Sequence, residues 1–274
     1  MVEYPTCMAR RSTHSGRYPF RGTDYGRIPY VHSTSEYPFR SVPLQGHCSQ
    51  PLSLASPIGV LGGTFDPVHF AHLRLAEEIA DAIGLSKVRL IPTGTPPHRG
   101  TPRVSAAQRM EMVRLAIDGN PRFEADDREV RREGVCYTFD TLSELRAELG
   151  ERPLCLLMGS DAFSALTTWH RWEELFDLAH VVIAHRPGFS LQQLTSSLPG
   201  PLRKAYLQRL VSSTGLLRRD SAGAIYVKEI TALDIAATQI RGLLAGGGSA
   251  HYLVPEAVLD YIEANRLYKE RDAR

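Results

Sequence analysis

From about Ile58 onward, short apolar runs alternate with amphipathic helical stretches, and this alternation constrains the fold more than any other feature of the chain. The pattern is typical of βαβ units that assemble into a parallel sheet. The run from Leu154 to Met158 is apolar at every position, as expected for a strand that helices cover on both sides. We therefore predict an α/β fold whose parallel sheet carries helices on both faces. The predicted strands lie in IGVLGG, KVRLIP, LCLLMGSD, HVVIAHRP and AIYVKEI.

Helices are expected between these strands and after the last of them. One is predicted from His69 to Ile83, one around Ala106 to Ile117, and one from Thr138, a suitable N-cap, to Leu149. A polar, helix-prone insertion lies between Pro187 and Gly223. The remaining predicted helices lie in WEELFDLA, ATQIRGLLAGG and PEAVLDYIEANRLY, the last with Pro255 well placed at its start.

Residues 1–56 differ from the rest, because they are rich in Arg, Ser, Tyr, Pro and Gly and show neither helical nor strand periodicity. We expect a disordered N-terminal extension followed by one domain over residues 57–270. The shortage of acidic residues resembles an organellar transit peptide, but the repeated Tyr-Pro pairs weaken that interpretation. A start codon assigned too far upstream explains the segment equally well.

Composition narrows the class of protein. The 274 residues are 43% hydrophobic, enough for a substantial core, and the net charge of +2 argues against binding to nucleic acid or a membrane surface. The chain has no apolar run long enough to span a membrane and no secretory signal, so we predict a cytoplasmic protein. Its oligomeric state is open, and a homo-oligomer is compatible with the sequence. The four cysteines lack metal-site or disulfide spacing and are expected to be free thiols: Cys7, Cys48, Cys136 and Cys155.

The stretch GGTFDPVHFAH carries the most chemistry. Gly62 and Gly63 directly follow a predicted strand, so the backbone can turn tightly and approach a ligand. The N–H groups at the start of the next helix form a ready anion site, and phosphate is the obvious anion. His69 and His72 project from one side of that first turn and can hydrogen-bond a phosphoryl group. Polar surface is the plainer interpretation of such histidines, and zinc is a poor one because no third ligand is evident.

The same stretch resembles the signature G-x-F-D-P-x-H-x-G-H of the nucleotidylyltransferase superfamily, whose members have a Rossmann-like fold. It is most similar to that of the bacterial nicotinate-nucleotide adenylyltransferases, and the likeness runs from about Ile58 to Tyr268. Further motifs occur in the family's order: IPTGTPPHR, QRMEMVRLAI, DREVRREGVCYTFDTL, MGSDAFSALTTWHRWEEL, HVVIAHRPG and DIAATQIRGLL.

The resemblance implies adenylyl transfer from ATP, with Mg²⁺, to nicotinate mononucleotide in NAD biosynthesis, giving deamido-NAD and pyrophosphate. Such a direct in-line transfer needs positioning and charge stabilisation but no nucleophile from the protein. His69, His72 and Arg241 are the implied catalytic residues, and no protein metal ligand is implied. The implied ATP-binding residues are Gly62, Thr64, Phe65, His69, His72, Asp161, Thr238 and Arg241. Phe65 as plain core and Asp161 as a helix N-cap are the alternatives at those positions.

For the mononucleotide, the resemblance points to three segments, of which the loop around Gly94 to Thr101 is expected to close over the pyridine ring. Trp169 is preferred to Trp172 as the residue that stacks on that ring. The implied substrate-binding residues are His98, Arg99, Tyr137, Thr138, Thr168 and Trp169.

Two positions depart from the family pattern: Ala71 replaces the usual glycine between the histidines, and Ala236 replaces the usual serine in the late motif. We expect the protein to remain active despite both replacements, but with an altered affinity for ATP. Three alternatives stay open: preference for the amide nucleotide, a sister enzyme of the superfamily such as a phosphopantetheine adenylyltransferase or a cytidylyltransferase, and a nonenzymatic nucleotide-binding module.

Overall fold

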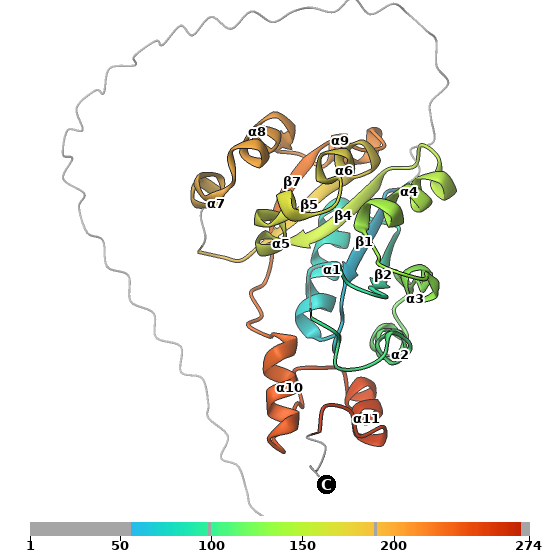
Figure 1. Ribbon diagram of the computed structural model, residues 1–274. Helices are drawn as coiled ribbons and strands as arrows, with labels where there is room; N and C mark the ends of the chain where they lie inside the picture. The colour runs from blue at the N-terminus through green and yellow to red at the C-terminus, as the bar shows by residue number, and fades with distance from the viewer. Residues whose placement is uncertain (1–55, 98–99, 189–190, 270–274) are drawn as a thin grey trace, which may run out of the picture. The chain divides into compact units, whose positions relative to one another are not determined.

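The computed structural model describes residues 56–97, 100–188 and 191–269, and the predicted N-terminal extension lies outside these ranges (Figure 1). Within them, seven strands form one sheet in the order β3-β2-β1-β4-β5-β7-β6, and every neighbouring pair is parallel. The predicted α/β, Rossmann-like sheet is therefore confirmed. The strands are β1 (Ile58–Gly63), β2 (Lys87–Pro92), β3 (Phe123–Ala125), β4 (Leu154–Gly159), β5 (His180–His185), β6 (Leu210–Val211) and β7 (Ile225–Glu229).

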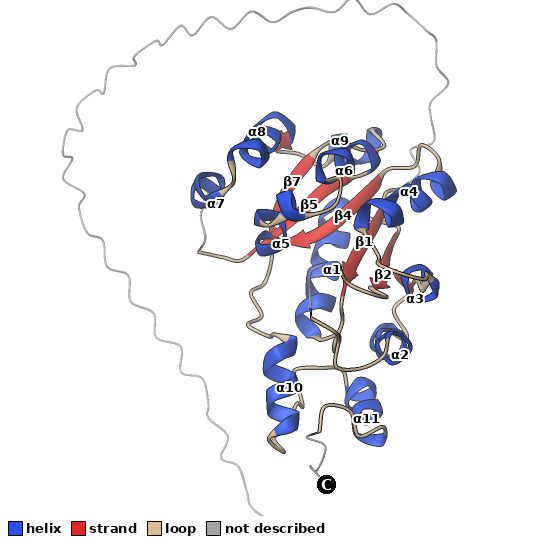
Figure 2. Cartoon of the chain, viewed as in Figure 1, coloured by secondary structure: helices blue, strands red, loops and turns tan. Residues whose placement is uncertain are grey.

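Helices cover both faces of this sheet (Figure 2). They are α1 (Phe70–Ile83), α2 (Ala106–Ile117), α3 (Arg128–Arg131), α4 (Thr138–Leu149), α5 (Ser160–Ser164), α6 (Leu175–Leu178), α7 (Leu191–Ser197), α8 (Gly200–Arg209), α9 (Gly215–Arg219), α10 (Ala237–Ala245) and α11 (Glu256–Ala264). Two short 3-10 turns, η1 (Leu166–Thr168) and η2 (Trp172–Glu174), complete the set.

Strand β4 shows why its run is apolar throughout. Leu154, Leu156 and Met158 belong to the buried cluster that includes side chains of α4, α5, α6 and α8. Cys155 and Leu157 point to the opposite face, where they join side chains of α1, α2 and α11. Successive residues of a strand face opposite sides of its sheet, so a strand between two helical layers must be apolar at every position.

Several boundaries differ from the sequence-based expectation. Strands β3 and β6 were not predicted, because three and two residues are too short to show a period. Thr138 is the first residue of α4 and not its N-cap, so that prediction was wrong; Tyr137 precedes it in an extended conformation. The last predicted helix ends at Ala264, and the chain then turns through Arg266 and Tyr268, both with positive φ.

The order of the strands fixes where a ligand can bind. Strand β1 lies between β2 and β4. The chain leaves β1 toward β2 and leaves β4 toward β5, in opposite directions along the sheet, so the two connections cover opposite faces. Ligands of open α/β sheets bind in the crevice beyond the carboxyl end of the strands at such a point. Figure 1 shows α10 and α11, in orange and red, beyond this end of β1.

Two of the expected free thiols, Cys136 and Cys155, are buried and unpaired with another cysteine, whereas Cys7 and Cys48 lie outside the described residues. Burial raises the pKa of the Cys155 thiol to about 12, so this group is inert at neutral pH. Among the described residues, no helix has the length and apolar character needed to cross a membrane.

Candidate active site

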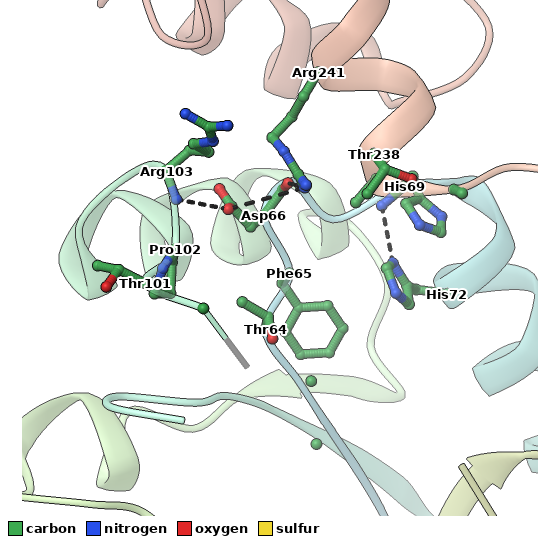
Figure 3. A pocket seen from close by; sticks show the side chains of 15 residues that line it. Thr64, Phe65, Asp66, His69, His72, Thr101, Pro102, Arg103, Thr238 and Arg241 are labelled. Atoms are coloured by element: carbon green, nitrogen blue, oxygen red, sulfur yellow. Dashed lines mark hydrogen bonds and ion pairs between the residues drawn. The ribbon is translucent and has the colours of Figure 1, made fainter. Parts of the chain in front are cut away.

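A cavity of about 560 Å³ opens beyond the carboxyl end of β1 (Figure 3). Three segments distant in sequence line it: the loop from β1 into α1, residues 100–103, and the start of α10. The cavity brings together seven of the residues predicted to bind ATP: Gly62, Thr64, Phe65, His69, His72, Thr238 and Arg241.

Phe65 is a buried residue of the loop between β1 and α1. Its side chain is only 2% exposed, and its backbone has a φ of 49°, in the left-handed region. The ring lies under Gly63, where an added Cβ would approach it to 3.2 Å, and meets the ring of His72 edge-on at 5.0 Å. The side chain of Phe65 is therefore part of the hydrophobic core, which was the alternative role predicted for it. The residue nevertheless lines the cavity as well.

The two histidines stack on each other at the start of α1. Their ring centroids are 3.7 Å apart with an interplanar angle of 24°. The backbone N–H of His69 donates to Nδ1 of His72 over 3.3 Å, so a neutral His72 carries its proton on Nε2. The contact also makes it costly for both rings to be charged at once.

His69 is the buried member of the pair, with 5% of its surface exposed. Burial lowers the pKa of its imidazole from 6.5 to about 4. It is therefore neutral at physiological pH and can act on a phosphoryl group as a hydrogen-bond partner, not as a cation. Among the described residues, no cluster of three His, Cys, Asp or Glu side chains could hold a metal ion.

Helix α10 supplies another part of the wall, and Figure 3 shows its Thr238 beside His69. Ala236, its N-cap, has extended backbone angles but no side-chain oxygen, so no side chain caps the first turn. Ala237 and Thr238 of that turn line the cavity, and their backbone N–H groups belong to the set that a helix leaves without internal partners. Arg241, one turn further on, donates from Nη1 to the backbone oxygen of Asp66 over 2.7 Å.

Asp66 and Arg109 are central to the site and were not predicted. Asp66, 5% exposed, accepts a hydrogen bond from the backbone N–H of Arg103 over 2.8 Å (Figure 3). Arg109, 1% exposed, donates to the carbonyl oxygens of Thr64 at 2.7 Å and Gly94 at 3.0 Å. One sequence signal existed: Arg109 precedes Met112 and Val113 by three and four positions, which places it on the apolar face of α2.

A second cavity of about 440 Å³ adjoins the first and shares residues 101–103 with it. It is also lined by Gly94, Thr95, Pro96 and Arg109. Gly94 has no room for a side chain, because an added Cβ would collide with the backbone oxygen of Glu129. His98 and Arg99, predicted to bind the mononucleotide, lie outside the described residues.

The other segments predicted to bind the mononucleotide meet each other. The ring of Tyr137 lies 4.5 Å from that of His170, so the start of α4 is next to the turn that follows η1. Trp169, half-buried, packs against the cluster on the α4 face, and Thr168 donates its hydroxyl to the oxygen of Ala165 over 2.8 Å. Tyr137, Thr138, Thr168 and Trp169 line neither of the two cavities.

Asp161 is the predicted ATP-binding residue that the cavity does not include. It is exposed in the first turn of α5. Gly159 is the N-cap of that helix, so the alternative role of Asp161 as N-cap is wrong. Contact with a ribose hydroxyl stays a prediction.

Comparison with known proteins identifies the class that this fold and site define. The model of the cytidylyltransferase-like family matches residues 60–242. A protein of Dechloromonas aromatica named "Probable nicotinate-nucleotide adenylyltransferase" is 52% identical over 217 residues, which cover 79% of this chain and 99% of that protein. A protein of the same name from Pseudomonas aeruginosa is 46% identical, over 77% of this chain and 97% of its own. The chain thus belongs to the nicotinate-nucleotide adenylyltransferase family.

A solved structure agrees on the fold. Plasmodium falciparum nicotinic acid mononucleotide adenylyltransferase complexed with NaAD superimposes with a TM-score of 0.60, over 78% of this chain and 97% of that one. The two sequences are only 17% identical, so this likeness bears on the fold alone.

The burial of His69 predicts a stability change at acid pH. The unfolded chain protonates this imidazole near pH 6.5, whereas the folded protein does so only near pH 4. Between those values the unfolded state binds more protons, so folding stability falls as pH falls, by on the order of 3 kcal/mol for this residue. Urea unfolding at pH 7 and pH 4.5 should therefore show a smaller acid loss for His69→Gln than for the wild type. Equal losses in the two proteins would contradict the buried, neutral His69.

The uncapped start of α10 predicts that Ala236→Ser stabilises the protein. The backbone of Ala236 already has N-cap geometry, with φ −125° and ψ 140°, so a serine oxygen can accept from the N–H of Gln239. We expect a gain of about 1 kcal/mol, or roughly 2–4 °C in Tm. Thermal unfolding followed by circular dichroism measures it. Ala232→Ser, at an exposed position outside any helix, is the matched control, and an equal effect of both substitutions would exclude capping.

Proposed function

We propose that the protein transfers the adenylyl group of ATP to nicotinate mononucleotide, giving deamido-NAD and pyrophosphate. The observation that carries the proposal is the cavity beyond β1, where two histidines, an arginine and a helix N-terminus converge. Hydrogen-bond donors and positive charge gathered at one such point suit a polyphosphate. Membership of the nicotinate-nucleotide adenylyltransferase family supplies the identity of the two substrates. The catalytic domain spans residues 57–270 in this proposal.

The chemistry matches what the site contains. An oxygen of the 5′-phosphate of the mononucleotide attacks the α-phosphorus of ATP, and the bond to the β-phosphate oxygen breaks, leaving its electron pair on pyrophosphate. The second pKa of a phosphate monoester is about 6, so the attacking group is already ionised at neutral pH. No proton has to be removed, and a neutral His69 with a pKa near 4 is sufficient because no general base is needed.

In this mechanism His69 and His72 hydrogen-bond the α-phosphate, on which charge accumulates as the transition state forms. Thr238, together with the first N–H groups of α10, receives the β- and γ-phosphates. Arg241 uses one N–H on the oxygen of Asp66, and its remaining donors are available to the same phosphates. Gly62, Thr64 and Phe65 supply the backbone that shapes this end of the cavity.

For the mononucleotide we propose the second cavity together with the surface near Tyr137, Thr138, Thr168 and Trp169. The contact between Tyr137 and His170 supports this, since it brings two of the predicted segments together. The sharing of residues 101–103 by the two cavities supports it as well, because the reacting phosphates of the two substrates must meet. His98 and Arg99 are assigned to the same substrate, and Asp161 to a ribose.

Mg²⁺ is proposed to enter bound to ATP. Asp66 supplies the carboxylate that lines the first cavity, and each of its oxygens already accepts a hydrogen bond. The lining residues therefore fit a Mg²⁺ ion whose ligands are the phosphate oxygens of ATP. When bound, the ion neutralises phosphate charge.

The test is pyrophosphate release by the purified protein with ATP, Mg²⁺ and each mononucleotide in turn. We expect release with nicotinate mononucleotide, and much slower release with the amide. Faster release with the amide would assign the other pyridine nucleotide as substrate. No release with either, together with retained ATP binding, would leave a nonenzymatic nucleotide-binding module and refute the proposal.

Replacing His72 with alanine should lower kcat by about 10²- to 10³-fold, because it removes a hydrogen-bond donor to the charge that develops on the α-phosphate. The ring is half-buried, so the fold should persist, which circular dichroism and thermal unfolding can verify. His251→Ala is the matched control, since His251 is exposed and lines neither cavity. Near-normal turnover of a folded His72→Ala protein would disprove the role given to this imidazole.

A further inference from the structure

The segment after α11 reaches back to the loop that begins the active site. After Ala264 the chain turns through Arg266 and Tyr268, with φ of 50° and 63°. Left-handed backbone is costly for residues other than glycine and persists where surrounding contacts hold it. Leu267 between them is buried, and its N–H donates to the oxygen of Ile262 over 2.9 Å. The turn directs the side chain of Tyr268 inward.

The hydroxyl of Tyr268 donates to Oδ1 of Asp66 over 2.7 Å, across 202 positions of sequence. Burial, and then the Asp66 carboxylate, raise the pKa of this phenol, so it remains an O–H donor throughout the physiological range. Oδ2 of Asp66 is occupied by the backbone N–H of Arg103. The buried carboxylate is therefore held between the C-terminal segment and residues 101–103, which line both cavities.

Arg241 lies within reach of the same carboxylate. Its Nη1 is 4.0 Å from Oδ2 of Asp66, and its hydrogen bond goes to the Asp66 backbone oxygen. If Asp66 lost the hydrogen bond from Tyr268, its carboxylate would be left with an unpaired oxygen in a buried place. The charge of Arg109 also acts on this carboxylate, but two nitrogens of its guanidinium are held by the oxygens of Thr64 and Gly94. Turning toward the guanidinium of Arg241 is therefore the compensation we expect, and a closer pair would withdraw Arg241 from the phosphates of a ligand.

We propose that Tyr268 is a positioning residue for adenylyl transfer: by binding Asp66 it fixes the loop between β1 and α1 and leaves Arg241 available to ATP. The inference rests on the proposed function. It concerns the ATP side of the reaction, because Tyr268 binds Oδ1 of Asp66, whereas the backbone N–H of Arg103, from the segment that lines both cavities, binds Oδ2. A residue that lines neither cavity thereby sets the affinity of the site for phosphates.

Tyr268→Phe tests this, because it removes one hydroxyl and keeps the ring that fills the space. We expect kcat/KM for ATP to fall about tenfold, the effect of losing one hydrogen bond to a charged group, with the KM for nicotinate mononucleotide changed less than about twofold. Binding of α,β-methylene ATP, measured by calorimetry, should weaken by a similar factor. Tyr252→Phe is the matched control: this tyrosine also has a positive φ, of 65°, and is 88% exposed.

A second variant separates positioning from general support of the fold. In an Asp66→Asn background the neutral amide attracts Arg241 far less strongly than a carboxylate does, so Tyr268→Phe should change the ATP parameters less than about twofold. Three results overturn the proposal: ATP parameters of Tyr268→Phe equal to those of the wild type, equal losses for both substrates, or the same loss in the Asp66→Asn background. The analogue-binding arm needs no mononucleotide. A wild type that binds the analogue without transferring adenylyl therefore refutes the proposed function separately.

Discussion

The hydrogen bonds that buried Arg109 donates to two carbonyl oxygens hold the candidate site in shape. One bond reaches Thr64 in the loop after β1, and the other reaches Gly94 in the loop after β2. These loops line the first and the second cavity, respectively, so a single guanidinium fixes the spacing between them. Burial lowers the pKa of this group, but arginine stays charged at any physiological pH. Losing one of these hydrogen bonds would leave a buried N–H of a charged group without its partner, which commonly costs about 1.5–3 kcal/mol, so both loops are firmly bound to Arg109.

The site handles a highly charged substrate with few formal charges of its own. His69 is neutral because it is buried, and the stacked arrangement disfavours charge on both rings. The positive potential comes instead from the N-terminus of α10 and from Arg241, which line the same cavity. In the proposed mechanism this division suits in-line transfer: the neutral imidazoles meet the charge that develops on the α-phosphate, while Arg241 and the start of α10 hold the departing pyrophosphate.

Local patterns in the sequence predicted the sheet and one side of the site. The loop from Gly62 to His72 is contiguous, so its glycines, histidines and following helix could be recognised together. Five of the seven strands in the described residues were evident as apolar runs, and only the short β3 and β6 were missed. The roles of Asp66 and Arg109 were not predicted, because their hydrogen-bond partners are distant in sequence and come near only in the folded chain. Tyr268, 202 positions from Asp66, looked like the end of a helix, whereas two residues with positive φ turn it inward. Positive φ is signalled in a sequence mainly by glycine and more weakly by Asn, Asp and His, and Arg266 and Tyr268 are none of these.

The two departures from the family pattern have different consequences. Ala71 lies in α1 between the histidines but does not line the first cavity, so its methyl group occupies no space that a nucleotide needs there. Ala236 does line it, as the N-cap of α10 without a capping oxygen. A serine oxygen at that position would satisfy one N–H of the first turn, whereas alanine leaves all of them to the ligand. We therefore expect the second departure to lower the stability of α10 and to leave one more N–H donor for a phosphate. Of the two departures, it is the one expected to change ATP affinity.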